Sequence, residues 1–505
     1  MREFFYAIEE HLRNGLCPDD QVTTGAPYLA EAQNAVPVPY GVKTPRVLTA
    51  PYDGEDITEE WPFPQLFEGE ETALLCGQST IYEVASDYTL TELNLDIEPG
   101  GQWQVVFFGN SWFATNGETF AWKIAANADG YGFADAHASS DLKVNCLAKI
   151  NNRLVLGGVS GAEDGYGSTY FDSDQWAELF QRWKHVAEQE TFTDREQEFY
   201  LDWILWSDKG GGADDLPFAL FLAALGLYPS KYSAVKPLIM TSIEQHEIGM
   251  RPVSGCGPLL AMRDLGGNLA CYGDRACVQL TPDGTKYQPG KLYRIPIDSR
   301  SVLAGDELEH RWLSGGRMKH WVAGEPPQDD NFEHVFSGVE NVVAAFDPED
   351  REFYFSDGVL GAYVMNKQGL GGPCRYMPTS DILPGGMASI VDTGNQEMLV
   401  RVWPFDARER GTKHVTCVQV QYEGLQGRAV QVKWRTGSQQ FKFAPWCAMS
   451  PDGVAYPGVS FIDASVAVRG TPGDNNGSIG RIEVRYNGED RTHRRGTSAD
   501  NPAAD

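Results

Sequence analysis

The chain has 505 residues, which suggests two to four domains, although one large all-β unit can also reach this length. Its hydrophobic fraction of 42% and aromatic fraction of 11% exclude wholesale disorder. A formal net charge of −29 argues against a protein that grips duplex DNA, although a generally acidic or salt-adapted proteome would produce the same imbalance. With 54 Gly and 29 Pro, the composition favours short strands joined by turns.

Residues 1–66 are expected to form an N-terminal helix and an extended arm. The apolar spacing over residues 2–14 predicts a short amphipathic helix, and the Pro-, Gly- and acid-rich stretch that follows predicts extended chain. Acidic residues interrupt the N-terminal apolar stretch, so we do not expect a signal peptide. The longest apolar run, near residues 218–227, is shorter than the roughly 18 residues that a membrane helix needs.

Residues 67–172 contain repeated strand–turn–strand patterns. One covers residues 73–86, a second covers residues 103–116 with Gly109-Asn110 at its turn, and a third places Asn151-Asn152 between two apolar runs. Short antiparallel strands in this succession predict the first part of a β-propeller.

Residues 173–210 break the strand pattern and predict a helical insertion. Apolar residues recur at helical spacing from Trp176 to Val186, and Asp174 is a suitable N-cap. For the second half, around Trp203 and Trp206, the pattern fits either a second helix or a strand.

Strand patterns return over residues 211–410, which we assign to the remainder of the propeller. The clearest is AAFDPEDREFYFSDG, with Pro348-Glu349-Asp350 at the turn. Similar segments recur every few tens of residues, as propeller blades do. Longer strands over residues 411–490 predict a β-sandwich-like domain, and residues 491–505 have the composition of a flexible tail. The predicted fold class is therefore mainly β, a β-propeller platform with a helical insertion and a C-terminal β-sandwich-like domain.

The nine cysteines are widely spaced and form no CxxC pair, so we expect free thiols. The alternative is a disulfide between Cys271 and Cys277 in an oxidised particle, because these two residues are close in sequence. Neither a nucleophile elbow nor a phosphate loop occurs. His246, His310 and His320 lack partners at metal spacing. The acid pairs are best interpreted as solvated turns in a chain with 70 acidic residues: Asp19-Asp20, Asp214-Asp215 and Asp329-Asp330. We therefore predict no catalytic, cofactor-binding or metal residues, no cofactor, and no enzymatic activity.

Four segments, in the same order along the chain, resemble the nozzle proteins of short-tailed bacteriophages, also called tail tubular proteins of the second kind. They are VPYGVKTPRVLTAP; WQVVFFGNSWFATNG; AKINNRLVLGG followed by DWILWSDKGGG; and AAFDPEDREFYFSDG followed by AYVMNKQGLGG. The chain departs from the family in its Trp-rich insertion and its heavy acidic load.

The resemblance implies a structural virion protein of the phage tail, made in the host cytoplasm. Its implied partners are five further copies in a homo-hexameric ring, a head–tail adaptor protein below the portal, and tail fibre, spike or needle proteins. Viral double-stranded DNA would pass through an acidic lumen without specific binding, because cationic contacts would slow ejection. Trp176, Trp183, Trp203 and Trp206 are candidate interface anchors, or they fix the insertion to the propeller.

Two other functions remain open. A tail β-propeller that binds or cleaves glycans would use acidic, aromatic-lined clefts, and the chain has 13 Trp and 21 Tyr. A receptor-binding or scaffold propeller unrelated to phage would need no such cleft. A sixfold ring without hydrolysis distinguishes the nozzle from the glycan enzyme.

Overall fold

The structure is a computed structural model. It describes residues 3–22, 25–50, 64–69, 72–108, 111–123, 136–139, 142–161, 202–207, 249–284, 286–339, 341–356, 361–384, 386–406, 411–436, 439–473 and 476–488. These residues form two compact units. Unit 1 comprises Met1–Val47, Leu360–Tyr376 and Asp392–Asp505, and unit 2 comprises Leu48–Val359 and Met377–Val391. Each unit is described by itself.

Unit 2 is a β-propeller. Within its described residues, five antiparallel sheets each consist of four strands that are consecutive in the chain. The first two sheets are β5 Gln65–Glu68, β6 Ala73–Cys76, β7 Ile81–Val84 and β8 Leu90–Glu92; and β9 Gln104–Phe108, β10 Ser111–Thr115, β11 Phe120–Lys123 and β12 His137–Ser139. The third is β13 Leu142–Ile150, β14 Arg153–Gly161, β15 Trp203–Trp206 and β16 Gly249–Pro252. Local succession of this kind is the topology of propeller blades.

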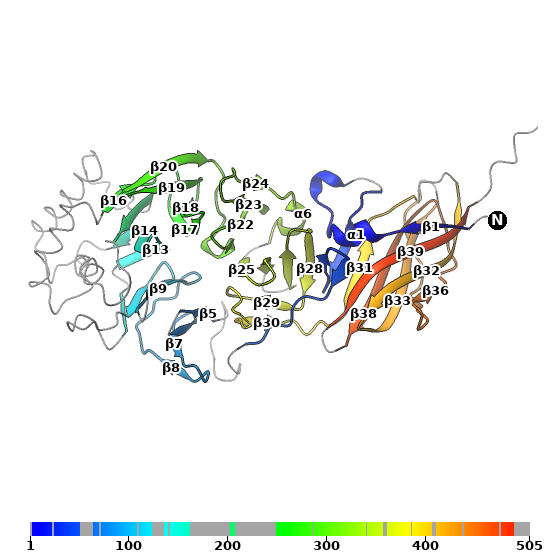
Figure 1. Ribbon diagram of the computed structural model, residues 1–505, viewed down its shortest axis with the longest axis horizontal. Coiled ribbons are helices and arrows are strands. Elements are labelled where there is room, and N and C mark those ends of the chain that lie inside the picture. The colour runs from blue at the N-terminus through cyan, green and yellow to red at the C-terminus, as the bar shows by residue number, and fades with distance from the viewer. Residues whose placement is uncertain are drawn as a thin grey trace, which may run out of the picture. The chain divides into compact units, whose positions relative to one another are not determined.

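The remaining strands of unit 2 continue the series (Figure 1). The fourth sheet is β17 Leu259–Leu265, β18 Asn268–Gly273, β19 Cys277–Asp283 and β20 Lys286–Tyr293. After η4 (Arg300–Val302) comes the fifth sheet, β21 Leu303–Gly305, β22 Glu309–Ser314, β23 Arg317–Val322 and β24 Gln328–Asp329. Helix α6 (Glu333–Phe336) and the hairpin of β25 Val343–Asp347 and β26 Glu352–Ser356 follow. The mainly β propeller predicted from the strand–turn–strand pattern is confirmed.

The segment Met377–Val391 joins the first blade to β25. The backbone N–H of Ile382 donates to the carbonyl of Phe346 at 2.8 Å, and the Thr379 and Ser389 hydroxyls donate to the carbonyl of Pro64, which precedes β5. A ring of blades is thereby closed by hydrogen bonds between segments that lie over 300 residues apart.

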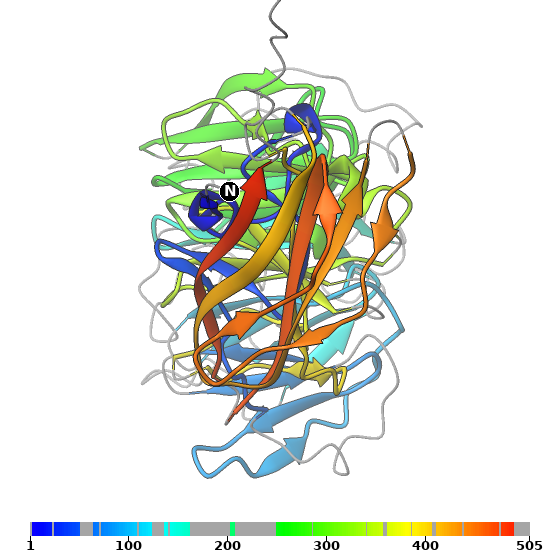
Figure 2. The same ribbon diagram turned by 90° about the vertical axis from the view of Figure 1, so that its right-hand side faces the viewer.

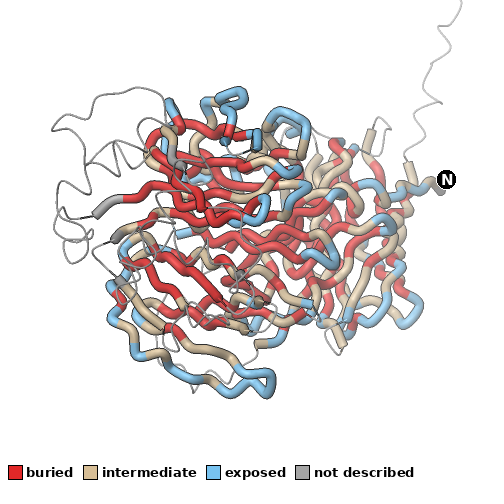
Figure 3. The backbone as a smooth tube through the Cα atoms, turned by 60° about the vertical axis from the view of Figure 1, so that its left-hand side comes forward, coloured by how far each residue is buried: buried red, intermediate tan, exposed pale blue. Residues whose placement is uncertain are grey.

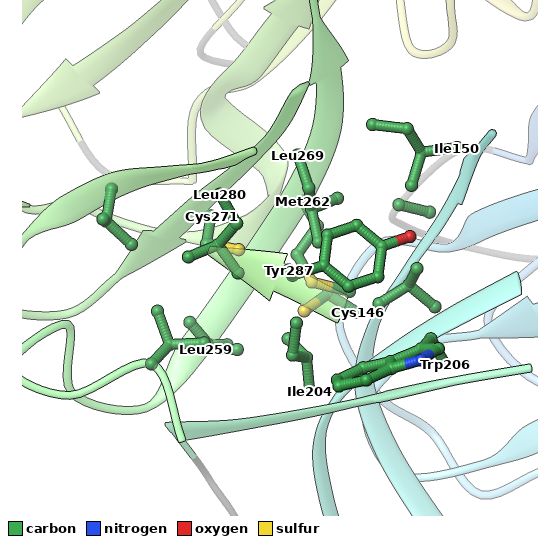
Figure 4. Close-up of a cluster of buried hydrophobic side chains, with 14 of the residues drawn as sticks. Cys146, Ile150, Ile204, Trp206, Leu259, Met262, Leu269, Cys271, Leu280 and Tyr287 are labelled. Atoms are coloured by element: carbon green, nitrogen blue, oxygen red, sulfur yellow. The ribbon is translucent and has the colours of Figure 1, made fainter. Parts of the chain in front are cut away.

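Packing between blades is apolar. The third and fourth sheets contribute a buried cluster that includes Cys146, Trp206, Met262 and Tyr287 (Figure 4). The ring planes of Trp206 and Tyr287 meet edge to face, with centroids 5.2 Å apart. In Figure 3 the strands of unit 2 are buried along most of their length and exposed at their turns.

Unit 1 is a two-sheet β-sandwich whose long strands are drawn in orange and red in Figure 2. One sheet has the order β3-β4-β39-β32-β36, with β1 paired to β39 and β37 to β32. Its strands are β1 Glu3–Ala7, β3 Val36–Val38, β4 Gly41–Lys43, β32 Lys413–Glu423, β36 Val454–Ala455, β37 Ser460–Phe461 and β39 Ser478–Gly488.

The other sheet of unit 1 has the order β2-β31-β38-β33-β34, with β35 paired to β33. Its strands are β2 Leu29–Gln33, β31 Met398–Val402, β33 Leu425–Arg435, β34 Lys442–Phe443, β35 Cys447–Ala448 and β38 Asp463–Pro472. Unit 1 also holds α1 Glu9–Arg13, η1 Asp19–Gln21 and the hairpin of β27 Ala362–Met365 and β28 Leu370–Cys374. A short two-stranded sheet consists of β29 Tyr376–Pro378 and β30 Ile390–Asp392.

Three expectations for residues 1–66 and 411–490 need correction. The helix predicted over residues 2–14 is replaced by β1 and the shorter α1, because Phe4 and Tyr6 alternate with exposed Phe5 and pair with β39. The expected arm instead supplies β2, β3 and β4 to the sandwich sheets. The sandwich unit begins before residue 411, since β31 is one of its strands.

The predicted insertion over residues 173–210 lies mostly outside the described residues, as does the tail over residues 491–505. Where it is described, at β15, the chain is a strand rather than a helix. The Asn151-Asn152 turn is confirmed: both residues have positive φ angles, 49° and 55°, as a tight hairpin requires. The Gly109-Asn110 turn lies outside the described residues.

Candidate functional site

The centre of the propeller contains a cavity of about 420 Å³. Its walls come from the first strand of each sheet, β5, β9, β13, β17 and β21, and from β25. Titratable side chains converge there from segments that are distant in sequence, among them Arg263, Arg300, Asp306, His310 and Asp381. This cavity is the candidate site because it gathers polar groups within an apolar ring of blades.

Two glutamines tie neighbouring blades together in this cavity. Gln65 of β5 accepts a hydrogen bond from the backbone N–H of Trp103 at 2.7 Å and donates to the carbonyl of Thr379 at 3.3 Å. Gln104 of β9 accepts from the N–H of Leu147 at 3.1 Å and donates to the carbonyl of Leu260 at 3.2 Å. Both ends of each amide therefore serve the backbone of another blade or of the closing segment.

Arg263 and Asp381 form a second tie. Nη1 of Arg263 donates to the carbonyl of Gly305 at 2.7 Å and lies 3.4 Å from Oδ2 of Asp381. The other oxygen of Asp381 accepts the backbone N–H of Phe346 at 2.9 Å. The pair links β17, β21, the closing segment and β25, and its side chains are 33% and 45% exposed. An ion pair so open to solvent contributes little stability by its charge alone.

Arg300 reaches from η4 to the second and third sheets. Its Nη2 donates to the carbonyl of Asn145, and to that of Thr115 at 3.5 Å. Space for the side chain depends on two glycines, since a Cβ on Gly101 would lie 2.8 Å from Cδ of Arg300 and one on Gly117 would lie 2.4 Å from Nη1. Burial lowers the pKa of Arg300 to about 10, which still leaves the guanidinium charged at neutral pH.

His310 is fully buried between the fourth and fifth sheets. Its Nδ1 lies 2.7 Å from the hydroxyl of Tyr272, and its Nε2 lies 2.9 Å from the carbonyl oxygen of Asp264. Nε2 must carry the proton, because a carbonyl only accepts, so Nδ1 accepts from the hydroxyl. Burial, aided by the charge of Arg263, lowers the pKa of His310 to about 3. The ring is therefore a neutral structural bridge, unsuited to proton transfer near neutral pH.

The carboxylates of the site are also engaged. Burial acts to raise the pKa of Asp306, but bonds from Arg351 at 2.6 Å and from the N–H groups of Leu308 and Glu309 leave it lowered. Burial raises the pKa of Asp264, whose carboxylate accepts the N–H of Gly267 at 2.8 Å. Both carboxylates thus accept hydrogen bonds from backbone N–H groups.

The acid pairs and histidines considered as candidate site residues in the sequence lie in ion pairs, hydrogen bonds or turns where the structure describes them. Asp329 and Asp330 pair with Lys319, with Arg311 at 2.6 Å and with His320 at 2.8 Å. Asp19 and Asp20 lie in the exposed turn η1. His246, Asp214 and Asp215 lie outside the described residues. No group of three or more potential metal ligands was found among the described residues.

Trp203 and Trp206 are buried in the third sheet, with exposed fractions of 9% and 2%. The prediction that they are exposed interface anchors is therefore wrong. Trp176 and Trp183 lie outside the described residues. Cys271 pairs with Val278, and Cys277 pairs with Tyr272 on the facing strand. Since facing residues share a side of the sheet, the two thiols point to opposite sides and remain unbridged.

Sequence reasoning missed the ties made by Gln65, Gln104, Arg263 and Arg300. A glutamine that begins a strand, or an arginine in a connection, is ordinary in any sequence. Only ring closure shows which backbone groups they meet.

Comparisons with known proteins do not assign this chain to a family. Neither a known protein family nor any curated protein matches the sequence. Among solved structures, PorZ of Porphyromonas gingivalis, a surface component of a type-IX secretion system, is 12% identical with a TM-score of 0.36, over 74% of this chain and 42% of that one. This chain thus spans less than half of PorZ. The WD40 domain of Neurospora crassa Pan2 is 7% identical with a TM-score of 0.34, over 68% and 88% of the two chains. A putative 6-phosphogluconolactonase from Bacteroides uniformis is 9% identical with a TM-score of 0.35, over 60% and 80%.

In the part of the chain that the structure describes, we find no helix with the length and apolarity that a membrane crossing requires.

Proposed function

We propose that the protein is a non-enzymatic structural component of a phage tail, a nozzle subunit that forms a ring, expected to be hexameric, around the channel for DNA ejection. The proposal starts from the four segments that resemble nozzle proteins and that occur in the same order along the chain. One structural observation supports it most: Gln65, Gln104 and Arg263, which line the cavity at the propeller centre, form hydrogen bonds to backbone groups of other blades or of the closing segment. Such a centre serves a rigid part rather than a catalyst.

The rival function, a glycan-cleaving propeller, requires a carboxylic acid and a carboxylate facing one sugar. In the cavity, Asp306 accepts a hydrogen bond from Arg351. Asp381 pairs with Arg263 and accepts the backbone N–H of Phe346. Because the pKa of Asp306 is lowered, it is a poor general acid. The two carboxylates therefore support cohesion better than hydrolysis.

The test is antibody labelling of tailed particles from the source lysate, together with the native mass of the purified chain. We expect gold label at the distal tail tube and a species of six times the monomer mass of 55.8 kDa. Label on fibres, with glycan hydrolysis abolished in Asp381→Asn, would replace the nozzle with the glycan enzyme. Absence of label from every particle would remove the tail assignment altogether.

A further inference from the structure

The outer side of one sheet of unit 1 carries aromatic rings held against cationic side chains. We call it the aromatic–cation face; its members are Arg401, Lys433, Arg435, Phe441, Phe443, Trp446 and Arg469. Strand pairing sets its membership: Lys433 faces Phe443 across β33 and β34, so the two side chains share one side of the sheet. Val430 and Val432, which alternate with Lys433, are fully buried on the other side.

Each ring of the face lies against at least one cation. Nζ of Lys433 lies 5.2 Å from the ring centroid of Phe441 and 5.1 Å from that of Phe443. The guanidinium of Arg469 lies 4.2 Å from the ring of Trp446. Phe443 is nevertheless 59% exposed. Rigid aromatic groups beside arginine and lysine, left open to solvent, have the composition of a protein–protein contact.

The charge of this face is unusual for the chain. Three of its arginines pair with Glu31, Glu397 and Asp463, at 3.1, 3.5 and 2.6 Å. Among the described residues, Lys433 forms no ion pair and lies instead against the two rings. In a chain of net charge −29, this face gathers four cationic side chains: Arg401, Lys433, Arg435 and Arg469.

The opposite charge is concentrated in the first blade of unit 2. Residues 47–122 contain 14 Asp and Glu and not one Lys or Arg. Asp87, Glu92, Asp96 and Glu98 are exposed on or beside the edge strand β8, and Tyr88 among them is 49% exposed. None of the ion pairs between described residues includes these four carboxylates, whereas Glu83 on β7 pairs with Lys123 at 2.6 Å. We call residues 87–98 the acidic edge.

We propose that the aromatic–cation face binds the acidic edge of the first blade of a second copy of this chain. Unlike-charged surfaces attract and fix the register of the contact, while the rings supply its apolar area. The contact joins two different surfaces, so every bound copy leaves one surface of each kind free for further copies. Repetition therefore closes a ring or grows a filament. The closed form rests on the proposed nozzle function, but the pairwise contact does not.

The test uses two full-length variants that damage opposite surfaces. Lys433→Glu reverses the charge between Phe441 and Phe443, and the double variant Asp87→Lys, Glu92→Lys reverses the acidic edge. Native mass should show each variant alone as a monomer, with self-association weakened at least about tenfold. Mixed together, the variants should associate again, because each keeps one intact surface and the two reversed surfaces are also opposite in charge. Lys291→Glu is the control, because Lys291 is exposed and, like Lys433, lies near an aromatic ring, 5.2 Å from that of Tyr293.

Three results would overturn the contact. One is normal assembly of Lys433→Glu, which leaves a ring, and hence the nozzle proposal, intact. The second is wild-type chain that stays monomeric at low and high salt; particle labelling then decides the nozzle question separately. The third is assembly unchanged by Lys433→Glu while binding of a single-stranded DNA oligonucleotide is lost, which would reassign the face to nucleic acid.

Discussion

The centre of the propeller is lined by polar side chains, whereas in the sandwich aromatic rings pack against one another. In unit 2 the first strand of each blade has an open inner edge, and Gln65, Gln104 and Arg263 bond to backbone groups there. In unit 1 the rings of Tyr6 and Phe405 stack with centroids 4.5 Å apart, and Phe405 meets Phe461 at 6.2 Å. The difference follows from geometry: blades around an axis present the edges of their first strands to the centre, while sandwich sheets present side chains to one another.

The largest expected effect is in the sandwich. Phe405→Ala removes a ring that is 1% exposed and contacts two others, so unit 1 should lose about 3–5 kcal/mol of stability. Urea titration followed by hydrogen exchange resolves the loss by peptide. Tyr456→Ala, at a residue 71% exposed, is the control and should change little. Equal losses of stability in both units would contradict this difference between the sandwich and the propeller.

Acid should destabilise the propeller through His310. The pKa of this ring is about 3 when folded and near 6.5 when unfolded, so the unfolded chain binds more protons between these values. The stabilisation is therefore complete above pH 6.5 and is lost as the pH falls, by about 3 kcal/mol at pH 4. Unfolding of unit 2 measured from pH 7 to pH 4 should show this slope. A slope unchanged in His310→Leu would assign the acid sensitivity to other groups.

The same substitution at two buried histidines should lower stability at one of them and not at the other. His310 has two hydrogen-bond partners, whereas neither ring nitrogen of His11 in unit 1 has a partner among the residues that the structure describes. Burial lowers the pKa of His11 to about 4. His310→Leu leaves Tyr272 and the Asp264 carbonyl unsatisfied and should cost about 1–3 kcal/mol. His11→Leu should leave stability at pH 7 unchanged or raise it by about 1 kcal/mol. Thermal unfolding compares them, and destabilisation of similar size by both would contradict the contrast.

The smallest expected effect is at the cavity. Gln104→Leu removes two bonds between blades and should cost about 1–2 kcal/mol, read as faster hydrogen exchange at Leu147. Gln288, exposed on β20, provides the control substitution to Leu. Undiminished protection at Leu147 would show that the tie is dispensable.

Local patterns predicted what is locally determined. The hairpins around Asn151-Asn152 and Pro348-Glu349-Asp350 follow from turn residues between apolar runs, and the structure contains both. Residues 3–43 were misassigned because their partners, β31 and β39, lie more than 350 residues away. The polar ties of the cavity were equally inaccessible, since Gln104 meets Leu147 and Leu260 only when the blades close into a ring.

The chain passes between the two units at residues 47–48, 359–360, 376–377 and 391–392. On the ribosome, β1 to β4 emerge before the blades of unit 2, yet Glu3 pairs with Asn487. The blades of unit 2 are made in between and can each form from neighbouring strands. Until β39 is made, Phe4, Tyr6 and Ile8 remain exposed to solvent. We therefore expect the segment from β1 to β4 to be the part of the nascent chain that a chaperone protects.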